Sequence, residues 1–162
     1  MSRRIVLEVE IHAPVGVVWE LLTNPAQIVR WLGVSATLDP RPHGQFRFEL
    51  FDGQYCSGHY VEVIRDRRVV FTWGWEGPAI PIPPGSTTVE IDLESPGPER
   101  TRLRLVHTGL DQAMEQLHAD GWQRYFQRLA AVAEGRDVPP DPSLPYQGPE
   151  ATPNPLARGD PA

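Results

Sequence analysis

The sequence LDQAMEQLHADGWQRYFQRLAAVAEG, residues 110–135, has the pattern of one long amphipathic helix. At about 100° per residue, its apolar side chains gather on one broad side and its Gln, Asp and Glu side chains on the other. Asp111 can cap the first turn, and Gly135, followed by prolines, ends the last one. The apolar side includes Trp122 and Tyr125, and it is too wide and too aromatic for a helix on an open surface. Other segments must therefore wrap around this helix.

The N-terminal part of the chain predicts a strand followed by two short helices. Residues 5–11 alternate between apolar and polar side chains, as in a half-buried strand. A proline suited to the first turn of a helix introduces residues 14–22. A second short helix is expected over residues 25–33, where a glycine closes it.

From residue 35 onward the hydrophobic period changes to two, which predicts an antiparallel run of about five or six strands. Prolines between Gly77 and Gly85 exclude regular pairing there, so this stretch is a loop, expected to lie over a cavity entrance. The whole pattern predicts an α+β fold in which a curved antiparallel sheet grips the long C-terminal helix, with two short helices after the first strand. The clearest strands are expected at residues 46–50, 54–64, 69–75, 89–94 and 103–107.

Several short motifs along this order of elements carry a family resemblance. They are residues 11–19 (beginning Ile-His-Ala-Pro), Trp31-Leu32-Gly33, Gly58 with residues 69–73, residues 103–109, and Gly121-Trp122. With them, residues 3–134 resemble the activator of heat-shock protein 90 ATPase homologue family, of the START-like, or SRPBCC, helix-grip superfamily. The resemblance implies a deep cavity between the sheet and the C-terminal helix that accepts apolar small molecules. Members of the superfamily include lipid and hormone binders, aromatic polyketide cyclases, oxygenase domains and co-chaperones.

Strand parity places an aromatic-rich set of side chains on the inner face, where it would suit a flat or apolar ligand. Plain core packing is the alternative for each aromatic, since a sheet around a helix needs such residues in any case. Trp73 and Trp75, beside the proline loop, are the better candidates. The predicted ligand-contacting residues are Trp31 at the cavity mouth, Phe46, Phe48, Tyr55, His59, Phe71, Trp73, Trp75, His107, Gly121, Trp122 and Tyr125.

Two histidines and one glycine in this set leave alternatives open. His107 shares inward parity with Leu105, and its role is either a hydrogen bond that fixes the turn before the long helix or contact with a ligand. His59 also has inward parity, unless a bulge at Gly58 turns it outward. Gly121 costs the helix about 1 kcal/mol relative to alanine, so it either leaves room for a ligand or lets a strand approach closely.

Signatures of catalysis and of cofactor binding are missing from the sequence. It has no CxxC, HExxH, P-loop, nucleophile elbow or dinucleotide fingerprint. Its histidines lack metal-ligand spacing, and Cys56 alone makes neither a zinc site nor an internal disulfide. We therefore predict no catalytic residue, no metal and no cofactor.

Charge and hydropathy limit the classes of partner. A net charge of −6 without a basic run argues against a nucleic-acid surface. No segment approaches the roughly 18 consecutive apolar residues of a membrane span, and the N-terminus lacks the apolar run of a signal peptide. We expect a cytoplasmic protein.

The chain divides into a START-like SRPBCC domain at residues 1–135 and a proline-rich tail at residues 136–162. Eight prolines and few apolar residues predict a disordered or polyproline-like extension. Leu144, Pro145 and Tyr146 could dock back onto the domain or onto a second copy, which would make a homodimer.

Three functions are compatible with these patterns. The first is a small-molecule binding protein for an apolar or aromatic ligand. The second is a co-chaperone-type interaction module, although the chain has no counterpart of the separate N-terminal domain of the eukaryotic co-chaperones, which argues against activation of a chaperone ATPase. The third is a cyclase or hydrolase that acts on an aromatic polyketide-like substrate through His107 or His59.

Overall fold

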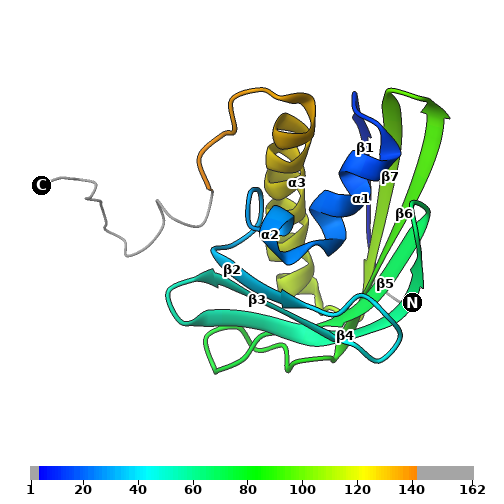
Figure 1. The fold of residues 1–162 in the computed structure, drawn as a ribbon. Helices are drawn as coiled ribbons and strands as arrows, with labels where there is room; N and C mark the ends of the chain where they lie inside the picture. The colour runs from blue at the N-terminus through cyan, green and yellow to red at the C-terminus, as the bar shows by residue number, and fades with distance from the viewer. Residues whose placement is uncertain (1–3, 142–162) are drawn as a thin grey trace, which may run out of the picture.

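A seven-stranded antiparallel sheet wraps around one long helix in this computed structural model, which describes residues 4–141 (Figure 1). The predicted α+β helix-grip fold is confirmed. The elements in chain order are β1 (Arg4–Ile11), α1 (Val15–Thr23), α2 (Pro25–Ile28), β2 (Ser35–Leu38), β3 (Gln45–Phe51), β4 (Gln54–Ile64), β5 (Arg68–Trp73), β6 (Thr87–Gly97), β7 (Arg100–Thr108) and α3 (Gln112–Glu134).

The strand order β1-β7-β6-β5-β4-β3-β2 is a meander closed at one end by the first strand. Each of β2 to β6 pairs with the next strand in sequence, and β1 pairs with β7. The sheet curves so that α3 lies in its concave side and contacts β1 and α1 (Figure 1). The inner face of α3 and the inner strand residues therefore share one core.

The long helix has both predicted ends. The Asp111 side chain accepts a hydrogen bond of 2.9 Å from the backbone N–H of Met114. Gly135 ends the helix in the left-handed conformation, at φ 73°, as a C-terminal glycine does. Between these ends, the inner face buries Trp122, Phe126 and other apolar side chains.

Three element boundaries differ from the sequence prediction. The helix expected over 25–33 is one turn of α2 followed by turns, and a short strand, β2, precedes β3. Strand β5 ends at Trp73, and Trp75 belongs to the sheet only through an isolated bridge to Cys56. The strand ends there because the proline loop folds back onto it, with the Trp75 N–H donating to the carbonyl of Ile82 at 2.7 Å.

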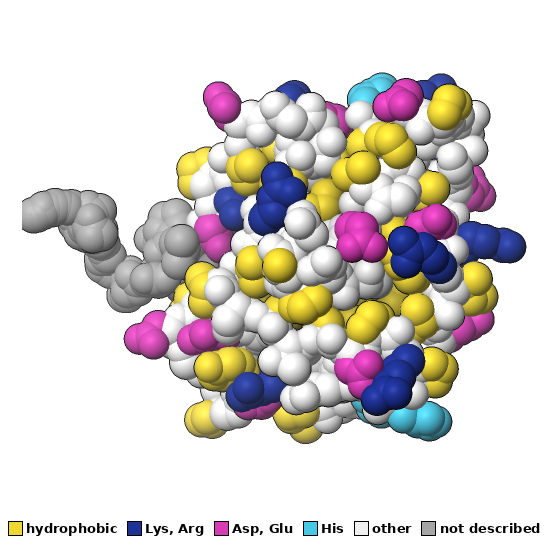
Figure 2. Space-filling view, in the orientation of Figure 1, with side chains coloured by type: hydrophobic (Ala, Val, Ile, Leu, Met, Phe, Trp, Pro, Cys, Tyr) yellow, Lys and Arg dark blue, Asp and Glu magenta, His cyan; other side chains and the backbone are white. Residues whose placement is uncertain are grey.

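The outer face of the sheet is a solvated face of cross-strand ion pairs. Arg68 donates to Glu62, Glu90 and Asp92 at 2.8 to 2.9 Å. Such cross-strand pairs stabilise the surface modestly. On the side that carries α1 and α2, Figure 2 shows basic and acidic side chains interspersed without a large area of one sign, so this side offers a polyanion no basic stripe.

Candidate ligand-binding site

A cavity of about 570 Å³ lies between the ends of β3 and β5, the proline loop and the N-terminal half of α3. Apolar side chains predominate among the residues that line it. They are Leu32, Phe48, Leu50, Phe51, Trp73, Trp75, Ile80, Leu117, His118, Asp120, Gly121, Trp122, Arg124 and Tyr125.

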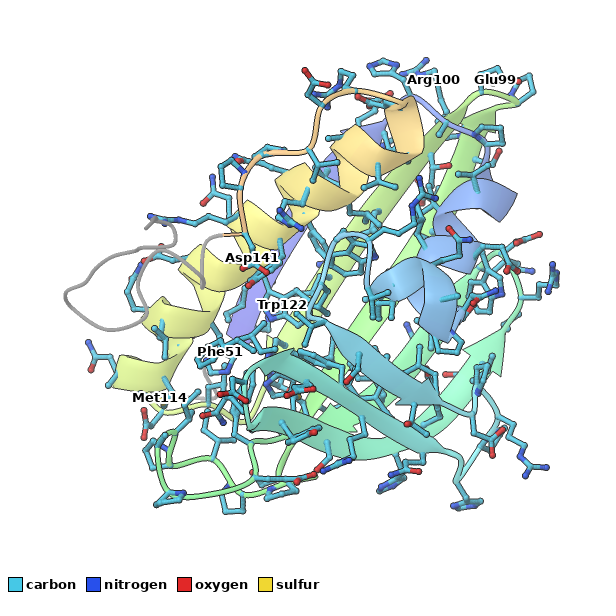
Figure 3. The ribbon with its side chains drawn as sticks, turned by 60° about the vertical axis from the view of Figure 1, so that its left-hand side comes forward. Phe51, Glu99, Arg100, Met114, Trp122 and Asp141 are labelled. Atoms are coloured by element: carbon cyan, nitrogen blue, oxygen red, sulfur yellow. The ribbon has the colours of Figure 1, made fainter. Side chains whose placement is uncertain are left out.

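Three tryptophans from separate parts of the chain line this cavity. Trp73 ends β5, Trp75 follows it, and Trp122 comes from α3; each is at most 5% exposed. The ring centroid of Trp73 lies 5.0 Å from that of Trp122 and 5.6 Å from that of Trp75. The cavity therefore has a closely packed aromatic wall at the junction of the sheet and α3, near the Trp122 label in Figure 3.

Gly121 adds space to this wall. A Cβ atom built on Gly121 would meet no heavy atom within 4 Å apart from its chain neighbours and its own helix backbone. No strand approaches the glycine closely, so of the two alternatives from the sequence the geometry supports room beside the helix. Gly121 also lines the cavity, which agrees with the interpretation that it leaves room for a ligand.

His107 stands one layer behind the wall and holds it in place. Its side chain is fully buried, and its Nδ1 accepts a hydrogen bond of 3.0 Å from the Nε1–H of Trp122. Because an indole nitrogen only donates, Nε2 of this imidazole carries the proton and donates to the Thr87 hydroxyl at 2.9 Å. Thr87 in turn donates to the carbonyl of Trp73 at 2.9 Å. This chain of hydrogen bonds joins α3 to β5 and β6.

His118 makes an equivalent pair with the second wall tryptophan. The Nε1–H of Trp75 donates to Nε2 of His118 at 3.0 Å, so the proton of this imidazole is on Nδ1, which donates to the Met114 carbonyl at 2.8 Å. Both ring nitrogens of His118 are therefore occupied as well. The two imidazole centroids lie 5.5 Å apart.

Burial keeps both imidazoles neutral. Desolvation, followed by the nearby His118, lowers the pKa of His107 to about 3. Desolvation also lowers the pKa of His118, opposed by the hydrogen bond to the Met114 carbonyl. A proton on Nδ1 of His107 or on Nε2 of His118 would displace a tryptophan N–H from its acceptor.

The free energy of unfolding is expected to decrease as the pH falls below the ordinary histidine pKa of about 6.5. Both folded pKa values are lowered, so the unfolded chain binds more protons below about pH 6.5, and stability is lost as the pH falls. For His107 this loss continues to about pH 3. The expected slope is up to about 1.4 kcal/mol per pH unit for each histidine. Urea denaturation over a series of pH values measures it.

His107→Gln is the control for that measurement, because an amide can accept from Trp122 and donate to Thr87 but does not titrate. Its slope should be lower than that of the wild type by the contribution of one histidine. Equal slopes in the two proteins would contradict a neutral, buried His107.

Six of the predicted ligand-contacting residues line the cavity, and six do not. Those in the lining are Phe48, Trp73, Trp75, Gly121, Trp122 and Tyr125. The others are His107, which lies behind Trp122, and Trp31, Phe46, Tyr55, His59 and Phe71. Whether the six lining residues contact a ligand stays a prediction.

Tyr55 was predicted to face inward, and this is wrong. Of the two orientations left open for His59, the structure has the outward one. On β4, Tyr55 and His59 stand opposite Glu49 and Gln45, whereas Cys56 stands opposite the inward Phe48, so both belong to the outer face. His59 is exposed, and its parity with Val63 is broken by a register shift between Tyr60 and Glu62. The bulge considered at Gly58 is thus found between Tyr60 and Glu62. Tyr55 lies under the guanidinium of Arg47, 3.9 Å from the carbon to the ring centroid.

Trp31, Phe46 and Phe71 belong to the closed core and not to the cavity. Trp31 is 1% exposed, and its Nε1–H donates to the Leu21 carbonyl at 2.7 Å, so it does not lie at the mouth. Its neighbour Leu32 lines the cavity instead. Phe46 and Phe71 stack with centroids 4.0 Å apart, which fills the space that a ligand would need between them.

The sequence prediction omitted several residues of the cavity lining. Ile80 comes from the proline loop, which was expected over the entrance, and its position agrees with that expectation. The remaining omissions lie at the end of β3, after α2, or on the side of α3 away from the centre of its apolar arc. They are Leu32, Leu50, Phe51, Leu117, His118, Asp120 and Arg124.

The composition and geometry of residues 4–141 limit the kinds of site. No group of three or more His, Cys, Asp and Glu residues is arranged to hold a metal ion within this range. None of the helices described there is long and apolar enough to cross a membrane. Leu144, Pro145 and Tyr146 lie outside the described residues.

A family model described as activator of Hsp90 ATPase homolog 1-like protein matches residues 12–134. The chain belongs to this family. The resemblance predicted from the short motifs is therefore confirmed. No curated protein matches the sequence.

Solved structures agree with membership of the Hsp90 ATPase activator homologue family. The AHSA1-like protein of Rhizobium etli is 38% identical, over 88% of each chain, with a TM-score of 0.69. The Aha1 dimer of Colwellia psychrerythraea shares the fold at 16% identity and a TM-score of 0.70, over 82% of this chain and 96% of that one. DynU16, a putative protein of the dynemicin biosynthetic locus, shares it at 24% identity and a TM-score of 0.70, over 85% of this chain and 50% of that one.

The part of the chain that matches the family contains the whole cavity lining. The lining runs in sequence from Leu32 to Tyr125, within the matched residues 12–134. The segment after Gly135 lies beyond the match.

Proposed function

We propose that this protein binds an apolar or aromatic small molecule in the cavity beside α3. The observation that carries the proposal is a space of about 570 Å³ with a predominantly apolar lining, which its own side chains leave open at Gly121. Ligand sites in proteins have about 300–1,000 Å³ and are lined mainly by hydrophobic and aromatic side chains. A flat or aliphatic ligand would lie against Trp73, Trp75 and Trp122.

One buried polar group behind the surface of the wall lacks a hydrogen-bond partner within residues 4–141. The Nε1–H of Trp73 is buried and has no partner among the described residues, whereas those of Trp75 and Trp122 donate to histidines. An unpaired buried donor costs about 1–3 kcal/mol, which an acceptor that reached it would recover.

The hydrogen bonds of the two buried histidines weigh against acid–base catalysis in the cavity. A general base needs a free lone pair within reach of the substrate proton. Both nitrogens of His107 and of His118 are already engaged, and His59 is exposed on the outer face. A cyclase or hydrolase that uses these histidines is therefore less well supported than a binding protein.

Titration with the neutral fluorescent probe N-phenyl-1-naphthylamine tests the proposed function. We expect saturable fluorescence enhancement and competition by members of a panel of fatty acids and aromatic metabolites. Native mass spectrometry of the same mixtures should show a stoichiometry of one ligand per chain. No saturable binding of the probe, together with no ligand-bound species from the panel, would contradict the proposal.

A second candidate function is that of a co-chaperone-type interaction module. The family description and a structural match favour it: the HSP90 activator of Plasmodium falciparum has a TM-score of 0.66 at 18% identity, over 84% of this chain and 99% of that one. The test is stimulation of the ATPase of a bacterial heat-shock protein 90 by the purified chain. An unchanged ATPase rate would contradict the co-chaperone function. It would leave the proposal of small-molecule binding unaffected.

A further inference from the structure

The segment after the long helix turns back and runs beside it. Gly135 reverses the chain, and Figure 1 shows the following residues, in orange, returning along α3. Arg128 on α3 holds this segment by donating to the carbonyl of Pro139. The same guanidinium donates, at 3.1 Å, to the carbonyl of Trp31 in the body of the domain. The chain is therefore directed from the end of α3 back toward the cavity.

The last described residue is fastened to the cavity wall. The hydroxyl of Tyr125 donates to the carboxylate of Asp141 at 2.5 Å, and Asp141 is 8% exposed. Tyr125 itself lines the cavity. Figure 3 shows Asp141 on the same side of the molecule as Trp122 and Phe51, two other members of the lining. Whatever follows Asp141 begins next to the cavity.

The residues that follow Asp141 are uncharged and include apolar side chains, which suit an apolar cavity. Residues 142–149, PSLPYQGP, carry no charged side chain and include Leu144, Pro145 and Tyr146. An extended chain covers about 3.3–3.6 Å per residue, so these three side chains are within roughly 10–18 Å of Asp141. The prolines restrict the backbone beforehand, which lowers the entropy cost of docking. The exposed Leu117 at the cavity edge, 52% accessible, offers an apolar surface to such a segment.

We propose that Leu144–Tyr146 of this chain occupies the mouth of its own cavity and competes with the small-molecule ligand. This inference rests on the proposed function, because it makes the tail an internal competitor for the same site. A tether of a few residues gives the segment a local concentration in the millimolar range, which is enough for weak contacts to hold it. Ligand binding then requires displacement of the tail.

The double variant Leu144→Ser/Tyr146→Ser, in the full chain, tests this competition. If the tail occupies the cavity about nine-tenths of the time, the wild type binds N-phenyl-1-naphthylamine about tenfold more weakly than the variant does. Leu156→Ser is the matched control, since it removes a leucine of the same tail further from Asp141, and it should leave the dissociation constant unchanged. Equal dissociation constants in wild type and double variant would overturn the inference.

A second measurement separates this inference from the proposed function. The indole N–H signals of Trp73, Trp75 and Trp122 in ¹H–¹⁵N spectra without ligand should shift between wild type and double variant, and not in Leu156→Ser. If no variant binds the probe but these signals shift, the proposed function fails and the docked tail stands. Unchanged signals overturn the tail proposal, whatever the probe does. If the indole signals change with protein concentration, the cavity is occupied by the tail of a second copy. That result would overturn the proposal that the chain's own tail occupies it.

Discussion

Trp122→Ala is expected to lower the free energy of unfolding by about 3–5 kcal/mol, the usual cost of emptying a buried aromatic site. Trp122 is 5% exposed, and its ring lies 5.0 Å from Trp73 and 5.4 Å from Phe126, centroid to centroid. The substitution also removes the donor that His107 accepts from. Urea denaturation at neutral pH measures the loss.

Trp122→Phe separates packing from hydrogen bonding at the same position. The phenyl ring keeps most of the apolar contacts but leaves Nδ1 of His107 buried without a donor, which costs about 1–3 kcal/mol. We expect this variant to fall between wild type and Trp122→Ala. A loss of only about 0.5 kcal/mol in Trp122→Ala, the range of ordinary surface substitutions, would show that the aromatic wall is not a structural core.

Gly121→Leu is expected to abolish or strongly weaken binding of an apolar probe while the domain stays folded. A leucine there would extend into space that no neighbouring atom occupies within 4 Å of the Cβ position, inside the cavity. Helix propensity should even favour the change, since glycine costs about 1 kcal/mol relative to good helix formers. Probe titration and thermal unfolding, measured on the same preparations, give the two results.

Gly16→Leu is the matched control for this experiment. Gly16 is also a helical glycine, on α1, with no heavy atom within 4 Å of an added Cβ, but it does not line the cavity. It should keep the affinity for the probe. If both variants bind the probe like the wild type, the cavity beside Gly121 is not the binding site. If Gly121→Leu unfolds the protein, the glycine is needed for packing, contrary to the open space at its Cβ position.

Helices and strands with a clear hydrophobic period could be predicted, because that period is contained within one short segment of sequence. The 3.6-residue period of α3 and its caps at Asp111 and Gly135 lie within one segment, and each of the predicted strands has its own alternation. One register shift was enough to defeat parity on β4. The shift between Tyr60 and Glu62 exchanges the inner and outer faces of the strand. The inward position of Val63 therefore does not imply an inward His59.

Membership of the cavity was harder to predict than membership of the core. A helical wheel orders side chains around α3 but does not say where the sheet stops covering it. Leu117, Asp120 and Arg124 line the cavity because the sheet and the proline loop leave that flank of the helix open. Phe46 and Phe71 share the inward parity of Phe48, yet they stack on each other and close the space deeper in the sheet.

The amino-acid sequence alone determined the helix-grip fold, the family, and an aromatic inner face with Gly121 on α3, because each depends on periodicity or on motifs within short segments. Only the tertiary structure decided which tryptophans border open space, which imidazole nitrogens they bond to, and where the chain after α3 returns. Those features depend on contacts between residues distant in sequence, such as Trp75 with His118, 43 positions apart. Such contacts arise from the way the sheet curves around α3, which no local pattern encodes.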